Sequence, residues 1–267
     1  MPVFVTETEF QVVRTLAFVA AIGAALGLQR LLPHARVAGS WRVNGALWTV
    51  NLLVIGVVCG ACACVVSRWA AGTGFGALNL GGAPLWAAVL VTILALDLLS
   101  YLWHRANHRV GFLWRFHRVH HSDPSFTAST ALRFHPGELV MSLPLRLAAV
   151  AALGAPVEGV IAFEVVFGFA NLVEHGDIAL PAGLDRRLAA VLVTPALHRR
   201  HHSQRLAELD TNFGTIFTFW DRLLGSFHAS SAAARFATGL AGVTPPASLR
   251  TALAFPFRSP SGRASLA

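Results

Sequence analysis

Eight of the twelve histidines in this chain lie in two short segments, residues 104–121 and 198–202. They are His104, His108, His117, His120 and His121 in the first segment and His198, His201 and His202 in the second. Their spacings of three and four residues place side chains on one face of a helix. Neutral imidazole is the commonest metal ligand in proteins, whereas a hydrophobic core rarely needs so many polar rings. The two segments therefore predict a metal site.

Two further histidines are candidates for the same site. His175 ends an apolar stretch and stands four residues after Asn171, so the two side chains share a helix face. We expect His175 to bind metal, and Asn171 and Glu174 either to bind metal or to orient a ligand. His135, in the motif R-F-H-P-G-E, is expected either to bind metal or to hydrogen-bond a metal ligand.

The make-up of the cluster indicates two metal ions held almost wholly by imidazole. The zinc motif H-E-x-x-H is absent, and the several glutamates of soluble di-iron bundles are missing. The acids expected to accept the outer N–H of ligating rings are Asp97, Asp123, Glu174, Asp210 and Asp221. Asp97 is favoured because an acid within an apolar span is costly. His34 and His228 stand alone and are expected to lie outside the site.

Composition predicts that these histidines belong to a membrane protein. The chain is 55% hydrophobic and only 13% charged, against about 25% charged residues in soluble domains. Three apolar runs are long enough to span a bilayer, at about 13–32, 47–67 and 84–103, and two weaker ones follow at about 139–153 and 157–174. We therefore expect an all-α integral membrane bundle of about four to five membrane helices, with a cytoplasmic helical cap that holds the dimetal site.

The positive charges predict which side of the membrane holds the cap. All 21 basic residues are arginines, and they concentrate in the loop between the first two spans, in residues 105–137 and in residues 175–267. Because basic loops favour the cytoplasmic side, both histidine segments are expected there, provided that 139–174 forms a hairpin returning to the same side. Membrane orientation explains the basic charge better than nucleic-acid binding, which we do not expect.

Three parts of the chain are distinguished by composition. Residues 1–83 are expected to form an N-terminal transmembrane anchor, residues 84–228 the catalytic domain, and residues 229–267 a flexible tail rich in small residues and proline. Within the catalytic part, Thr194 and Pro195 predict a helix start just before His198.

The motifs resemble the fatty acid hydroxylase/sterol desaturase superfamily of membrane di-iron oxygenases. The family pattern of H-x3-H, H-x2-H-H and a later H-x2-H-H is matched by the two histidine segments. Between them, His135-Pro136 and the N-x3-H element ending at His175 are similar to family motifs. Residues 212–225 resemble the closing N-[YF]-G and W-D-x-L-[FL]-G segments, so the resemblance covers about residues 90–228.

This resemblance implies an enzyme with two non-haem iron ions, dioxygen as oxidant, and electrons from a separate reductase and carrier. It implies hydroxylation or desaturation of a C–H bond in a lipid such as a sterol or a fatty acyl lipid. Acyl-lipid hydroxylases often carry histidine where Asn171 stands, so water or Glu174 is an alternative ligand there. Two other functions stay open: a carotenoid hydroxylase of the same chemistry, and a histidine-rich metal or proton transporter. No paired repeats of the transporter kind occur in the sequence.

Overall fold

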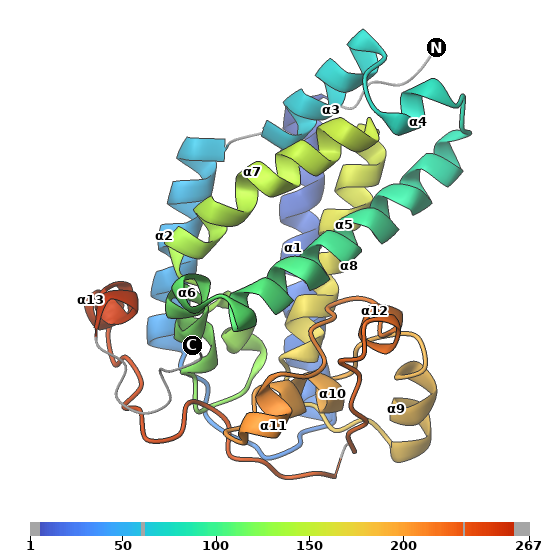
Figure 1. Ribbon diagram of the computed structural model, residues 1–267. Coiled ribbons are helices and arrows are strands. Elements are labelled where there is room, and N and C mark those ends of the chain that lie inside the picture. The colour runs from blue at the N-terminus through green and yellow to red at the C-terminus, as the bar shows by residue number, and fades with distance from the viewer. Residues whose placement is uncertain (1–5, 60–61, 232, 259–267) are drawn as a thin grey trace.

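The computed structural model describes residues 6–59, 62–231 and 233–258, and this part of the chain is helical without any β-strand. Figure 1 shows long helices running alongside one another, with most of the short helices gathered at one end. The long helices are α1 (Glu7–Leu31), α2 (Trp41–Cys59), α3 (Cys62–Thr73), α5 (Leu85–Arg109), α7 (Pro136–Leu153) and α8 (Val157–Glu174). The short elements are α4 (Ala77–Leu80), α6 (Gly111–His121), η1 (Ala128–Leu132), α9 (Ala182–Leu188), α10 (Pro195–His201), α11 (Leu206–Leu209), α12 (Phe219–Leu223), α13 (Leu249–Ala254) and η2 (Phe255–Phe257).

Among the described residues, three helices are long and apolar enough to cross a membrane, by length and composition. They are Gln11–Leu31 of α1, Leu85–Arg109 and Pro136–Leu153. The last of these was a weaker candidate in the sequence. The expected span 47–67 is instead divided between α2 and α3, and its residues 60–61 lie outside the described part. The other weak candidate forms α8, which carries three glutamates in its 18 residues.

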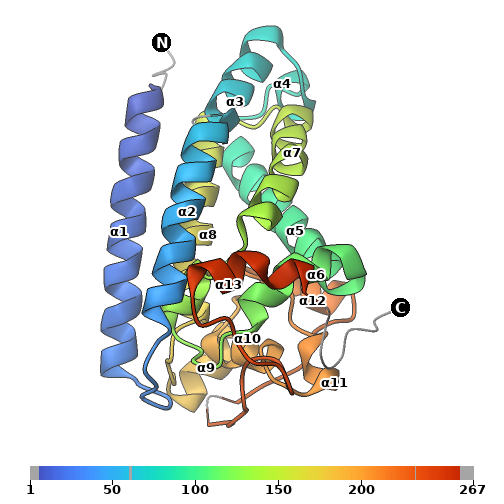
Figure 2. The ribbon, with the colours of Figure 1, turned by 90° about the vertical axis from the view of Figure 1, so that its left-hand side faces the viewer.

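Apolar side chains hold the long helices together. Helix α8 packs against α1 and α5, and α3 packs against α7. One buried cluster joins Leu96 of α5, Val150 of α7 and Phe163 of α8. Figure 2 shows α1 at the edge of the bundle, alongside α2 and α8. The bundle thus fixes the ends of α5, α7 and α8 at the same end of the molecule as the short helices.

The short helices α9 to α12 form a cap at that end (Figure 1). The predicted start of α10 is confirmed: Thr194 is the N-cap, its side chain accepts a hydrogen bond from the Leu197 amide, and Pro195 is the first helical residue. The cap is tied to the bundle by Asp97 of α5, whose carboxylate accepts hydrogen bonds from the Phe217 amide at 3.3 Å and from Trp220 Nε1 at 2.9 Å.

Residues 249–257, expected to belong to a flexible tail, form α13 and η2 and pack against the bundle. Ala252 and Phe255 are buried in a cluster with Leu47 of α2 and Val119 of α6. The Arg118 guanidinium lies 4.7 Å from the centroid of the Phe255 ring and donates to its carbonyl. Small apolar residues that look like a linker in the sequence are therefore ordered here, because α2 and α6 provide a surface that buries them.

Candidate metal centre

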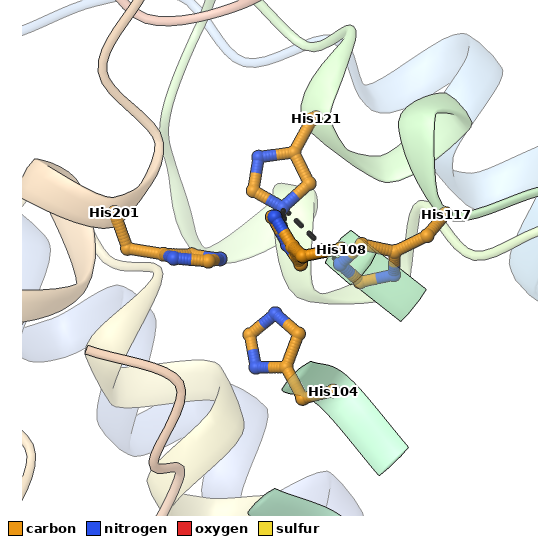
Figure 3. A group of neighbouring side chains, drawn as sticks. All are labelled: His104, His108, His117, His121 and His201. Atoms are coloured by element: carbon orange, nitrogen blue, oxygen red, sulfur yellow. Dashed lines mark hydrogen bonds between the residues drawn. The ribbon is translucent and has the colours of Figure 1, made fainter. Parts of the chain in front are cut away.

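Nine histidines from four separate parts of the chain converge where the long helices meet the cap. They form two groups, and within each group the ligand atoms lie within 4.8 Å of one another. The first group is His104, His108, His117, His121 and His201; the second group is His120, His175, His198 and His202. In Figure 3 the five rings of the first group point toward a common centre. The groups contain all nine histidines that the sequence singled out as metal ligands.

In the first group, three rings are held by hydrogen bonds on the side away from the centre. The Nδ1–H of His104 donates to the Phe213 carbonyl at 2.8 Å, and that of His201 to the Thr211 carbonyl at 2.7 Å. The Nδ1–H of His117 donates to the Glu138 carboxylate at 2.9 Å. Since a neutral ring carries one proton, these bonds leave a lone pair on each Nε2.

The Nε2 atoms of the first group lie close to one another. His121 Nε2 is 3.1 Å from His108 Nε2 and 3.2 Å from His117 Nε2. Metal–imidazole bonds of about 2.0–2.1 Å at right angles would separate neighbouring nitrogens by about 3 Å. The spacing of these nitrogens is thus that of ligands around one transition-metal ion.

The second group has the same arrangement with four rings. His175 Nε2 is 3.0 Å from His120 Nε2 and 2.9 Å from His198 Nε2. The Nδ1–H of His175 donates to the Asn171 carbonyl at 2.7 Å, so its Nε2 also carries a lone pair. His202 is 1% exposed, and neither of its ring nitrogens has a hydrogen-bond partner in the described chain.

The two groups adjoin, and each draws rings from both histidine segments. The ring of His121 stacks on that of His202 with centroids 4.2 Å apart, and His120 lies 4.7 Å from His202. The two segments therefore contribute rings to adjoining groups in the structure.

The protein environment keeps several of the rings neutral. Burial lowers the pKa of His201 to about 3. Burial, together with the charge that neighbouring rings would carry, lowers the pKa of His120 and His202 well below its ordinary value. A neutral ring is the form that binds metal, and buried nitrogens without a partner are costly. The buried, unpartnered Nε2 atoms of His104, His201 and His202 accordingly fit a pair of metal ions.

The acids around the rings differ from those expected. Glu138 was not among them, yet its Oε1 accepts from His117 and from the Asn107 amide at 3.1 Å. The available signal was its place in the first turn of an apolar helix whose N-cap is His135. Glu174 and Asp210 do lie near rings: Glu174 is 3.7 Å from His198 Nδ1, and Asp210 is 3.6 Å from His108 Nδ1.

The other three expected acids contact no histidine ring of the groups by hydrogen bond. Asp97 binds the backbone of residues 216–217 and Trp220. Asp221 accepts from the Phe213 and Gly214 amides and from Ser226, and so holds the loop whose carbonyl receives the His104 proton. Asp123 accepts from the side chains of Ser40, Asn44 and Thr130. Backbone amides at the turns of the cap need acceptors, and Asp97 and Asp221 supply them.

The side chains of His135 and Asn171 form other hydrogen bonds and belong to neither histidine group. His135 is the N-cap of α7: its Nδ1 accepts from the Gly137 amide at 2.9 Å, and its Nε2 lies 3.2 Å from the Leu253 carbonyl. The Asn171 side-chain amide donates to the Ala131 carbonyl, whereas its backbone carbonyl orients His175. His34 and His228 belong to neither group, as expected.

A cavity of about 650 Å³ leads from the rings into the bundle. Its lining includes His104 and His117 of the first group and His120, His175 and His198 of the second. Most of its wall is apolar and comes from α1, α2, α5, α7 and α8, with examples in Phe18, Leu99 and Leu143. A long apolar ligand in this cavity would reach both groups.

The fold and the site together define a class: a helical protein with membrane-length helices, a histidine-rich centre suited to two metal ions, and an apolar cavity beside it. The chain belongs to the fatty acid hydroxylase family, whose model matches residues 89–226. The matched stretch contains all nine clustered histidines, so the family predicted from the motifs is confirmed.

The curated relatives are lipid hydroxylases and monooxygenases. An ornithine lipid hydroxylase of Rhizobium tropici is 34% identical over 145 residues, which is 54% of this chain and 43% of that protein. The alkylglycerol monooxygenase of Caenorhabditis elegans is 32% identical over 137 residues, 50% of this chain and 25% of that protein. Human cholesterol 25-hydroxylase is 28% identical over 149 residues, 55% of this chain and 53% of that protein.

The match with each of these three relatives therefore spans between a quarter and about half of the relative's length. No solved structure matches this chain.

Proposed function

We propose that this protein is a membrane-bound, dioxygen-dependent hydroxylase that uses two non-haem iron ions to oxidise a C–H bond of a lipid. The observation that carries this proposal is the convergence of nine imidazoles, eight buried and that of His104 half-buried, on an apolar cavity; they come from both histidine segments and from His175. The names of the three relatives, all hydroxylases or monooxygenases of lipids, favour hydroxylation over desaturation and over metal or proton transport.

The ligands in this proposal are the nine histidines of the two groups. Imidazole nitrogens suit iron among other transition metals, and dioxygen chemistry requires a redox-active ion, which zinc is not. Two iron ions held by these groups would supply the activation of dioxygen that an unactivated C–H bond requires.

The residues of the chain have three tasks in such a reaction. Glu138 and the carbonyls of residues 171, 211 and 213 fix the tautomer and direction of four rings, which keeps their Nε2 lone pairs aimed at the ions. The apolar wall of the cavity binds the hydrocarbon and excludes water. Asp97 holds the cap against the bundle and Asp221 orders the loop within the cap, and together they keep the rings of α10 opposite those of α6.

Orientation, domains and partners are part of the same proposal. The positive-inside rule supports a cytoplasmic location for the histidine groups. Residues 84–228 would form the catalytic unit. Residues 1–83 would anchor it and also line the cavity, since Phe18 and Trp48 belong to its wall. Electrons would come from a separate reductase and carrier.

The test combines metal content with product analysis. Purified protein should contain about two iron ions per chain and should consume oxygen when given its lipid together with a chemical reductant or a reductase and carrier. Lipid extracts of cells with and without the gene should differ by one lipid class that gains the mass of a single oxygen atom. His120→Ala and His201→Ala should abolish this product, whereas His228→Ala, in a histidine outside both groups, should leave it. A product that persists in both His120→Ala and His201→Ala would refute the proposal.

A further inference from the structure

Three charged side chains line the apolar cavity away from the histidines. They are Arg14 of α1, Arg146 of α7 and Glu164 of α8. Arg14 and Arg146 lie within two of the three candidate membrane spans. A charged residue in such a span is costly and usually serves a function. The rest of the wall is mainly apolar, so these charges call for an explanation.

Two of the three charges compensate each other. Arg14 Nη1 lies 3.5 Å from Glu164 Oε2, across the contact between α1 and α8. The Glu164 side chain is 15% exposed. With this pair balanced, the part of the cavity away from the histidines keeps one positive charge, that of Arg146.

Arg146 has no charged or hydrogen-bonding partner within the described part of the chain. Its guanidinium carbon lies 5.6 Å from the ring centroid of Phe163 and 5.9 Å from that of Phe167. These contacts with ring faces leave the N–H donors of a guanidinium unused. Arginine matches the planar oxygens of carboxylate and phosphate better than any other side chain.

Helix geometry gives the distance between these charges and the metal centre. Arg146 follows Glu138, which binds His117, by eight residues on α7, and a helix rises 1.5 Å per residue, so the separation along the axis is about 12 Å. Glu164 precedes Glu174 by ten residues on α8, or about 15 Å. The charged positions therefore stand at similar heights above the histidines, inside one cavity.

We infer that Arg146, with the Arg14–Glu164 pair beside it, binds an anionic group at the polar end of the substrate and so sets which carbon reaches the metal centre. This inference rests on the proposed function and adds the substrate class, an amphiphile carrying a carboxylate or phosphate. An extended chain advances about 1.25 Å per carbon, from a C–C bond near 1.5 Å and an angle near 111°. The reacting carbon then stands on the order of ten carbons from the anionic group. A neutral carotenoid or sterol lacks such a group.

The test measures binding to the metal-free protein, so that it does not depend on hydroxylation. The probes are radiolabelled palmitate and its neutral analogue hexadecanol, with the full chain in non-ionic detergent. We expect Arg146→Leu to weaken palmitate binding about tenfold, the loss expected for one charge-assisted hydrogen bond, and to leave hexadecanol binding within about twofold. Arg146→Lys keeps the positive charge but not the planar pair of donors, and should lose less palmitate affinity than Arg146→Leu. Arg186→Leu, in an exposed arginine of α9, is the matched control.

Competition identifies the source of the anionic group. Displacement of palmitate by phosphatidylglycerol but not by phosphatidylcholine would assign the site to an anionic headgroup, and displacement by neither would assign it to a free carboxylate. Equal affinity of wild type and Arg146→Leu for palmitate, or equal loss of both probes, would overturn the inference and leave the proposed function standing. Arginine-dependent palmitate binding in a protein that never oxidises a lipid would instead refute the proposed function alone.

Discussion

Glu138 offers the sharpest test of how the chain holds its metal centre. The residue is 4% exposed, and its Oε1 accepts hydrogen bonds from His117 Nδ1 at 2.9 Å and from Asn107 at 3.1 Å. Replacing it with alanine leaves the outer N–H of His117 without an acceptor in a buried site. A lost hydrogen bond to a charged group costs about 1.5–3 kcal/mol. At about 1.4 kcal/mol per tenfold change, this cost corresponds to roughly a 10- to 100-fold loss of metal affinity. Mutations of residues that hydrogen-bond metal-bound histidines cause losses in the same range.

We therefore expect Glu138→Ala to lower the iron affinity of the first group by about 10- to 100-fold, measured by competition with a chelator of known affinity. Glu138→Gln keeps an acceptor oxygen and should lose less. Glu158→Ala is the matched control, because Glu158 also stands in the first turn of an apolar helix but is no hydrogen-bond partner of a ring. Unchanged iron affinity in Glu138→Ala, or an equal loss in Glu158→Ala, would refute the assigned role.

Three further predictions concern stability. Asp97→Asn should lower the melting temperature, because the Phe217 and Trp220 donors lose a charged acceptor at a cost of about 1–3 kcal/mol, while folded protein still binds iron. Gly137→Ala should cost about 1–3 kcal/mol in denaturant titration, since its Cβ would meet the Phe116 ring at 2.8 Å. For metal-free protein, rings such as His201 have a folded pKa of about 3 and an unfolded pKa near 6.5. The unfolded chain therefore takes up protons first, and stability should fall below about pH 6.5 by about 1.4 kcal/mol per pH unit for each such ring. Constant stability down to pH 4 would contradict this last prediction.

The nine histidines that the sequence proposes as ligands are the ones that the structure gathers into two groups, because metal coordination would restrict both residue type and spacing. Helix-capping preferences predict the start of α10: the Thr194 side chain accepts a hydrogen bond from a first-turn amide, and Pro195 is the first helical residue. The acids were harder to place, because which carboxylate meets a ring depends on how distant helices pack. Asp97 lies on the same helix as His104, yet its side chain turns to the cap backbone. Glu138 reaches His117 only because α7 begins beside α6.

The division of the histidines between the two groups follows from helix geometry that the sequence already contains. Each residue of a helix turns about 100° around the axis. Relative to position i, position i+4 therefore points about 40° to one side and position i+3 about 60° to the other, so i+3 and i+4 are about 100° apart. In the box 117–121 the i and i+4 rings enter the first group and the i+3 ring, His120, enters the second. In the box 198–202 the i and i+4 rings enter the second group and the i+3 ring, His201, enters the first. Each box therefore gives two rings to one group and one to the other, so neither group can form fully unless α6 and α10 face each other. This exchange explains why H-x-x-H-H occurs twice, and why the contacts that hold the cap on the bundle matter for both metal positions at once.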